Sequence, residues 1–173
     1  MIQIQIAEDR LHFRQISKLA NRIWTEHYTP IIGQEQVTYM LDKFQSVDAI
    51  KKQIREGSEY YVLSEEGKAL GYFCINRKKE SLFLSKLYVK KNYRGKGIGK
   101  IALQFIERKA VELGLGKISL TVNKYNSQSI EAYEKMGFVN IRALIQDIGN
   151  NFIMDDYLLE KKIINKDYTQ KKI

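Results

Sequence analysis

The stretch that decides the fold is Leu87-Tyr-Val-Lys-Lys-Asn-Tyr-Arg-Gly-Lys-Gly-Ile-Gly-Lys100. Leu82, Leu84, Leu87 and Val89 supply an apolar strand, and apolar residues recur at helical spacing from Ile101 onward. Between them lies a basic, glycine-spaced turn made of Arg94, Gly95, Lys96, Gly97, Gly99 and Lys100. A glycine-rich turn that leads into a helix presents free backbone N–H groups, and the helix N-terminus adds about half a positive charge. The stretch therefore predicts a phosphate or pyrophosphate site.

The glycine spacing decides which kind of phosphate site this is. Gly95-x-Gly97-x-Gly99 does not fit the dinucleotide pattern Gly-x-Gly-x-x-Gly. Ile101 follows Lys100 where a nucleotide-triphosphate loop needs Ser or Thr. The pattern that remains, Arg94-x-x-Gly97-x-Gly99, resembles the acetyl-CoA-binding signature of the GNAT family of N-acetyltransferases.

A second motif strengthens the resemblance. After a strand-like run at 118–122, the chain reads Asn126-Ser-Gln-Ser-Ile-Glu-Ala-Tyr-Glu-Lys-Met-Gly-Phe138. The GNAT family ends its CoA-binding half with Asn-x-x-Ala-x-x-x-Tyr-x-x-x-Gly-Phe. Four residues match this pattern, with Ser129 in the small-residue position: Asn126, Tyr133, Gly137 and Phe138. The resemblance is strongest over residues 82–138, which it identifies as the acetyl-CoA-binding half.

The resemblance implies an α/β (α+β) fold with a mixed, splayed sheet of about seven strands and helices on both faces. It implies acetyl-CoA as co-substrate and direct acyl transfer to a primary amine within a ternary complex, without a metal. The Asn126 side chain would bind the coenzyme together with backbone groups of the central strand and of the turn. These backbone groups belong to Leu87, Tyr88, Val89, Arg94, Gly95, Lys96, Gly97, Ile98, Gly99 and Lys100. Tyr133 would donate a proton or hydrogen bond to the departing thiolate, and packing in the core is the alternative. For Asn126 the alternative is helix N-capping.

The general base and the acceptor site are less well defined. Several relatives place a glutamate on the central strand, whereas this chain has Phe83, Ser85 and Lys86 there. Ser85 with a water, His27, or no protein base at all stay open as routes for the amine proton. Trp24, Tyr28 and Tyr39 are candidate walls of the acceptor site, with helix packing as the alternative. The resemblance extends to bacterial polyamine-type acetyltransferases, so the acceptor is expected to be a small, polyamine-like amine or a protein amine.

Composition limits the other function classes. The formal net charge is +9, but the basic residues are spread over several segments, so nucleic-acid binding is not expected to be the function. The single cysteine, Cys74, excludes an internal disulfide and suits a cytoplasmic protein, and with two histidines a metal site is not expected. No membrane span or signal peptide is expected. A non-catalytic acyl-CoA sensor on the same fold is the alternative function, and a homodimer stays open.

The rest of the chain predicts a single domain over residues 1–173, with a basic tail at about 162–173. A strand is expected around Ile2–Ile6, followed by a helix after Asp9 that the lone proline, Pro30, interrupts. Further helices are expected at 34–44 and from 47 to before Gly57, with Ser46 as a cap. Strands are expected at 59–63 and 70–76, and a terminal hairpin at 140–148 and 152–159.

Overall fold

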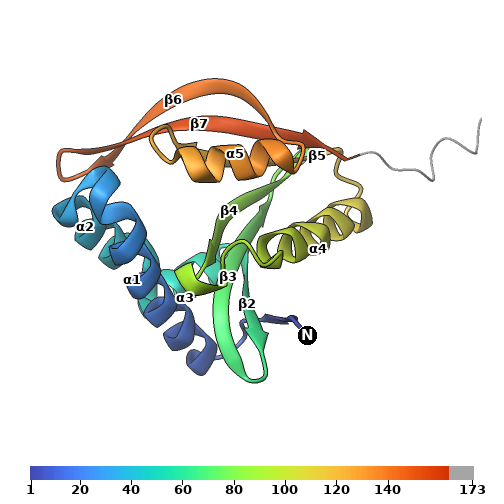
Figure 1. Ribbon diagram of the computed structural model, residues 1–173, viewed down its shortest axis with the longest axis horizontal. Coiled ribbons are helices and arrows are strands. Elements are labelled where there is room, and N and C mark those ends of the chain that lie inside the picture. Colours follow the sequence, from blue (N-terminus) through green and yellow to red (C-terminus); the bar gives the residue numbers. More distant parts are fainter. Residues whose placement is uncertain (164–173) are drawn as a thin grey trace, which may run out of the picture. The chain divides into compact units, whose positions relative to one another are not determined.

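The structure, a computed structural model, describes residues 1–163 (Figure 1). Its strands and longer helices follow the predicted order. The elements are β1 (Gln3–Ile6), α1 (Arg10–Ile32), α2 (Gln34–Gln45), α3 (Val47–Arg55), β2 (Ser58–Glu65), β3 (Lys68–Arg77), β4 (Ser81–Val89), a 3₁₀ turn (Lys91–Tyr93), α4 (Ile98–Glu112), β5 (Lys117–Asn123), α5 (Ser127–Lys135), β6 (Val139–Gly149) and β7 (Phe152–Lys162).

The seven strands are hydrogen-bonded in the order β1-β2-β3-β4-β5-β7-β6, and the sheet is mixed, as predicted. The chain forms two compact units. One comprises residues 1–76 and 85–102, and the other comprises residues 77–84 and the chain from 103 onward. Strand β4 contributes to both, because the units divide after Leu84. The basic tail predicted at about 162–173 lies almost entirely outside the described residues.

In the first unit the helices α1, α2 and α3 pack against one another, and α3 packs against β2. Asp9 begins α1 by accepting the His12 amide at 2.9 Å, and Ser46 caps α3 by accepting the Ala49 amide at 3.3 Å. Apolar side chains spaced along α1, among them Ile16, Ala20 and Ile23, are fully buried. Burial of one helix stripe, rather than helix propensity, therefore holds this layer together.

The prediction that Pro30 interrupts the first helix is wrong, because α1 continues to Ile32. A proline lacks one backbone donor and crowds the preceding turn, which usually ends a helix. Pro30 stands in the last turn, where only one hydrogen bond is lost after a long, packed helix. The Gly33 amide still donates to the Thr29 carbonyl at 3.0 Å, and Gly33 takes a left-handed φ of 83° that ends α1 and begins α2.

Strand β2 pairs antiparallel with both β1 and β3, and the hairpin strands β2 and β3 are longer than predicted. Gly71 of β3 lies against β4 so closely that a Cβ atom would stand 2.3 Å from the Tyr88 carbonyl oxygen. Only glycine fits at that approach. The end of β4 therefore depends on a residue that the sequence pattern did not mark.

In the second unit β5 runs parallel to the start of β4 and antiparallel to β7, and β6 and β7 form the predicted hairpin (Figure 1). Ser81 of β4 and Ser119 of β5 share a buried hydrogen bond at 3.1 Å. Ile118 and Leu120 of β5 and Leu159 of β7 are buried, and they form part of this unit's core.

Candidate functional site

The glycine turn leaves the end of β4, passes through a 3₁₀ turn and enters α4. Gly95 and Gly97 have positive φ angles of 73° and 80°, a backbone conformation that residues with a Cβ rarely adopt. A Cβ placed at Gly95, Gly97 or Gly99 would meet nothing within 4 Å. The turn thus combines an unusual backbone conformation with open space where side chains would stand, so a ligand can approach its backbone closely.

The prediction that Gly99 and Lys100 belong to the turn is wrong, because α4 already begins at Ile98. The first hydrogen bond of the helix runs from the Ile101 amide to the Gly97 carbonyl at 3.0 Å. The amides of Ile98, Gly99 and Lys100 therefore have no acceptor inside the helix. These residues keep the predicted capacity to bind an anion, but through the helix N-terminus instead of through an irregular turn.

Arg94 does not extend freely from the turn. Its Nε donates to the carbonyl oxygen of Val89, the last residue of β4, at 2.9 Å. Its Nη1 lies 3.2 Å from Nδ1 of His27 on α1. The Lys96 ammonium lies 5.2 Å from the centre of the Tyr93 ring. Two basic side chains of the turn, Arg94 and Lys96, are therefore held by specific contacts.

Two of the candidate acceptor-site residues, Trp24 and Tyr28, join one aromatic cluster with Tyr88 of β4. Ring centroids are 4.7 Å apart for Trp24 and Tyr28, and 5.5 Å apart for Trp24 and Tyr88. Trp24 is only 5% exposed, so most of its ring packs between helix and strand, whereas Tyr28 and Tyr88 are half-buried. Tyr39 lies on α2, where its hydroxyl accepts from Lys43 Nζ at 3.0 Å.

Ser85 and Lys86 occupy the middle of β4. Lys86 Nζ donates to Ser85 Oγ at 3.2 Å and to Gln53 Oε1 at 3.0 Å, and it lies 5.3 Å from the centre of the Tyr60 ring. Burial lowers the pKa of Lys86, because the charged form loses its hydration; the neighbouring Cys74 opposes this with a smaller effect. Burial also raises the pKa of the Cys74 thiol, which is consistent with a packing role.

The second unit carries the other sequence motif. Asn126 stands at the N-cap position of α5 and is 3% exposed, but its side chain makes no capping hydrogen bond to the helix. Simple N-capping, the alternative role for Asn126, is therefore not what the structure shows. Tyr133 is half-buried on α5, with its ring 5.4 Å from that of Phe138 and at 67° to it. Tyr133 thus lies in α5, and Asn126 immediately precedes the first residue of the same helix.

The two adjacent aspartates of β7, Asp155 and Asp156, differ in their surroundings. Asp155 pairs with Lys124, and the Lys124 amide donates to the Asp155 carbonyl at 3.0 Å. Asp156 is 4% exposed, and burial raises its pKa to about 6, an effect that a hydrogen bond from Thr121 partly offsets. Asp155 is therefore paired with a lysine, whereas burial is the main influence on Asp156.

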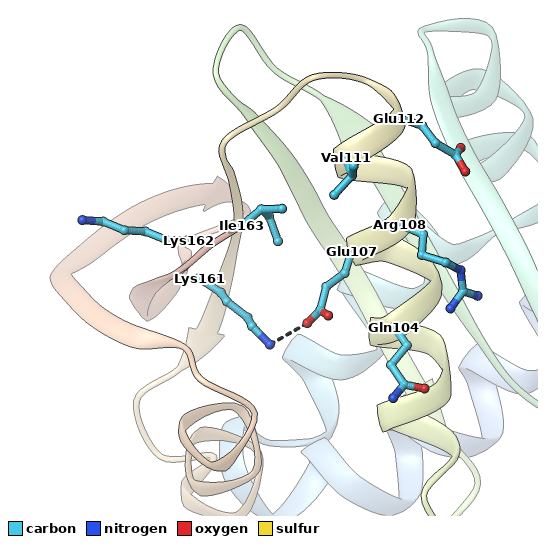
Figure 2. A pocket seen from close by; sticks show the side chains of 8 residues that line it. All are labelled: Gln104, Glu107, Arg108, Val111, Glu112, Lys161, Lys162 and Ile163. Carbon is cyan, nitrogen blue, oxygen red and sulfur yellow. Dashed lines mark hydrogen bonds and ion pairs between the residues drawn. The ribbon is translucent and has the colours of Figure 1, made fainter. Parts of the chain in front are cut away.

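A separate pocket lies on the second unit, between one face of α4 and the end of β7 (Figure 2). Lys161 Nζ and Glu107 Oε1 form an ion pair across it at 2.5 Å. None of the residues that the sequence predicts for the coenzyme or the acceptor lines this pocket. We therefore assign it no part in the candidate site.

Residues 1–163 contain no group of three or more His, Cys, Asp or Glu side chains that could hold a metal ion. Within the same range, no helix has the length and apolar character that a membrane span requires.

Sequence reasoning considered His27 only as a base and did not consider Gly71 at all. His27 contacts Arg94, which is 67 positions away in the chain, and no local pattern predicts such a pair. Gly71 has an ordinary strand conformation, and its role comes from the approach of another strand. A glycine inside a strand pattern is the only local signal for such an approach.

Comparison with known proteins gives the family. Residues 15–138 match the model of the acetyltransferase (GNAT) family. An uncharacterised N-acetyltransferase of Bacillus subtilis is 30% identical over 98 residues, which are 51% of this chain and 62% of that protein. A thialysine N-ε-acetyltransferase of Bos taurus is 31% identical over 72 residues, 41% of this chain and 42% of that protein. The matches thus span less than two thirds of either relative.

Solved structures share the fold. The PaiA N-acetyltransferase of Thermoplasma acidophilum, solved in complex with coenzyme A, superposes with a TM-score of 0.76 at 21% identity, over 94% of this chain and 99% of that one. The ribosomal-protein-S18-alanine N-acetyltransferase of Escherichia coli gives a TM-score of 0.71 at 16% identity, over 95% of this chain and 96% of that one. The family match, the glycine turn at the start of α4 and the shared fold lead to one conclusion: the chain belongs to the acetyltransferase (GNAT) family.

Proposed function

We propose that the protein is an acetyl-CoA-dependent N-acetyltransferase that transfers the acetyl group to a primary amine by direct attack. The observation that carries this proposal is the turn before α4, where Gly95 and Gly97 have positive φ angles, the space at their Cβ positions is open, and a helix begins at Ile98. That geometry fits a diphosphate, because its oxygens can accept from several amides at once. The family match supports the same choice of coenzyme.

In the proposed reaction the amine nitrogen attacks the thioester carbonyl, the C–S bond breaks, and the sulfur leaves as a thiolate that takes up a proton. Backbone groups of Leu87 to Val89 would bind the pantetheine arm, and an N–H near Val89 would stabilise the oxyanion; one such donor is typically worth about 3 kcal/mol. Asn126 would donate to the arm from its buried position at the start of α5. Tyr133 would donate to the thiolate.

The amine must lose a proton, and His27 is poorly suited to accept it. The Arg94 guanidinium can only donate, so His27 Nδ1 is the acceptor of their contact and the neutral ring carries its proton on Nε2. That leaves no lone pair for the amine proton. We propose that the amine binds in its neutral form, with the proton released to water near Ser85.

We propose a small molecule with a primary amine as the acceptor class. Relatives named for L-ornithine, thialysine and streptothricin acetylation support this class. A polyamine would also need carboxylates near the site, and two acidic side chains of the chain already contact a basic one: Glu26 lies 3.5 Å from Arg22 Nε, and Asp155 is paired with Lys124.

The test combines binding and turnover. Calorimetry should detect coenzyme A binding to the parent protein, and free-thiol release from acetyl-CoA should appear with at least one amine from a panel of amino acids, diamines and polyamines. Gly97→Asp should abolish both, because a side chain at φ 80° strains the turn and a carboxylate repels the diphosphate. Absence of heat with the parent protein, or normal binding by Gly97→Asp, would refute the proposal.

A non-catalytic acyl-CoA sensor is the second candidate. The central strand favours it in one respect, because Phe83, Ser85 and Lys86 stand where several relatives have a glutamate. A sensor would bind acetyl-CoA and release no thiol with any amine of the panel. The same experiment therefore separates the two functions.

A further inference from the structure

His27 on α1 contacts Arg94, the first residue of the glycine turn. Nδ1 of His27 lies 3.2 Å from Nη1 of Arg94, and Nε of the same guanidinium donates to the Val89 carbonyl at 2.9 Å. The His27 ring also packs edge-on against Tyr28, with centroids 4.8 Å apart and planes at 83°. All of these residues belong to the first unit.

The chemistry of the two side chains fixes the direction of the hydrogen bond. A guanidinium has only donors, so the imidazole nitrogen must accept, and the neutral ring then carries its proton on Nε2. Arg94 is therefore held between two acceptors on different elements, the last carbonyl of β4 and a side chain of α1.

We propose that His27 is a positioning residue for the coenzyme-binding turn, acting through Arg94. The turn contains Gly95 and Gly97, whose wide conformational freedom does not by itself hold the backbone in one shape. A tether at Arg94 restricts the turn before the ligand arrives, and such pre-organisation lowers the entropy cost of binding. The inference rests on the proposed function, because it takes this turn to bind the coenzyme diphosphate.

A positioning role and a base role predict different kinetics. A residue that shapes the coenzyme site raises the KM for acetyl-CoA and leaves kcat nearly unchanged, whereas loss of a base lowers kcat. The two roles also predict different results for a variant that keeps a hydrogen-bond acceptor at position 27 but has no base there. In His27→Asn the amide oxygen can occupy the place of Nδ1 and accept from Arg94, but an amide cannot act as a base near neutral pH.

The experiment compares His27→Phe, His27→Asn and the control His12→Phe. The Phe variant keeps a ring against Tyr28 and loses the acceptor. His12 lies on the same helix, where it pairs with Asp9, so its variant reports the general cost of losing a histidine from α1. Coenzyme A dissociation constants, KM, kcat and melting temperatures are measured for each protein.

We expect His27→Phe to bind coenzyme A about tenfold more weakly, with kcat at saturating acetyl-CoA within about twofold of the parent. His27→Asn should bind within about threefold of the parent, and His12→Phe should bind like the parent. In an Arg94→Met background, His27→Phe should cause no further loss of coenzyme A affinity, because His27 affects binding only through Arg94. If His27→Phe does not fold, His27→Leu replaces it in the same comparison.

Normal coenzyme binding by His27→Phe would overturn the inference, as would an Asn variant as defective as the Phe variant. A fall in kcat without a change in binding would assign His27 to catalysis instead. These results presuppose a parent protein that binds coenzyme A. If the parent does not bind it, the proposed function fails, which is a separate and recognisable outcome.

Discussion

At the scale of single residues, Tyr133 is the side chain on which the proposed chemistry depends most. Tyr133→Phe keeps the ring contact with Phe138 and removes only the hydroxyl. We expect kcat to fall by about 10²–10⁴, as for the loss of general-acid assistance, with coenzyme A affinity nearly unchanged. Steady-state kinetics and calorimetry check this, with exposed Tyr125→Phe as the control. An unchanged kcat would remove Tyr133 from the mechanism.

Burial of the Lys86 ammonium lowers the stability of the folded protein by an amount that depends on pH. Its pKa is lower in the folded protein than in the unfolded chain, mainly because of burial, so the unfolded state binds more protons between the two pKa values. This residue therefore costs stability at low and neutral pH, and the cost disappears as pH rises toward the usual lysine pKa of about 10.4. The Gln53 oxygen keeps the Tyr60 hydroxyl as a donor at 2.8 Å if Lys86 is removed.

We expect Lys86→Met to raise the free energy of unfolding at pH 7 by about 1–3 kcal/mol, because a buried charge is replaced by an apolar chain of similar length. The gain should shrink when urea unfolding is repeated at pH 10. The other titrating groups, including Cys74, are present in both proteins, so their effect drops out when the two unfolding free energies are subtracted. A variant less stable than the parent at pH 7 would contradict this account.

At the scale of elements, the approach of β3 to β4 depends on Gly71. In Gly71→Ala the new Cβ would stand 2.3 Å from the Tyr88 carbonyl oxygen and 3.1 Å from the Val89 Cα, so the backbone must shift. We expect a loss of about 3 kcal/mol in unfolding free energy, together with weaker coenzyme binding, because the shift falls at the end of β4.

Gly116→Ala is the matched control for this prediction, since a Cβ there meets nothing within 4 Å. Thermal unfolding and calorimetry on both variants give the comparison. Equal stability of the two variants would show that β4 adapts to the added methyl group at no cost.

At the scale of the whole molecule, the formal net charge of +9 predicts electrostatic attraction of the anionic coenzyme. The Debye length shortens from about 30 Å at 0.01 M salt to about 8 Å at 0.15 M. Stopped-flow association of coenzyme A should therefore slow by about tenfold over this range, and a coenzyme without its 3′-phosphate should show a smaller change. A rate independent of salt would mean that the charge plays no part in capture.

The local sequence determined the elements and the family. Alternation in β1, the apolar residues of β4, the caps Asp9 and Ser46, and the spacing of the turn glycines each act through neighbours in the chain. They predicted the element order and the coenzyme motif. The tertiary structure decided what depends on distant neighbours. Packing along the rest of α1 lets the helix continue past Pro30, a strand approach makes Gly71 necessary, and folding brings His27 to Arg94. Short-range patterns encode backbone geometry, whereas partners far apart in the chain meet only after the elements pack.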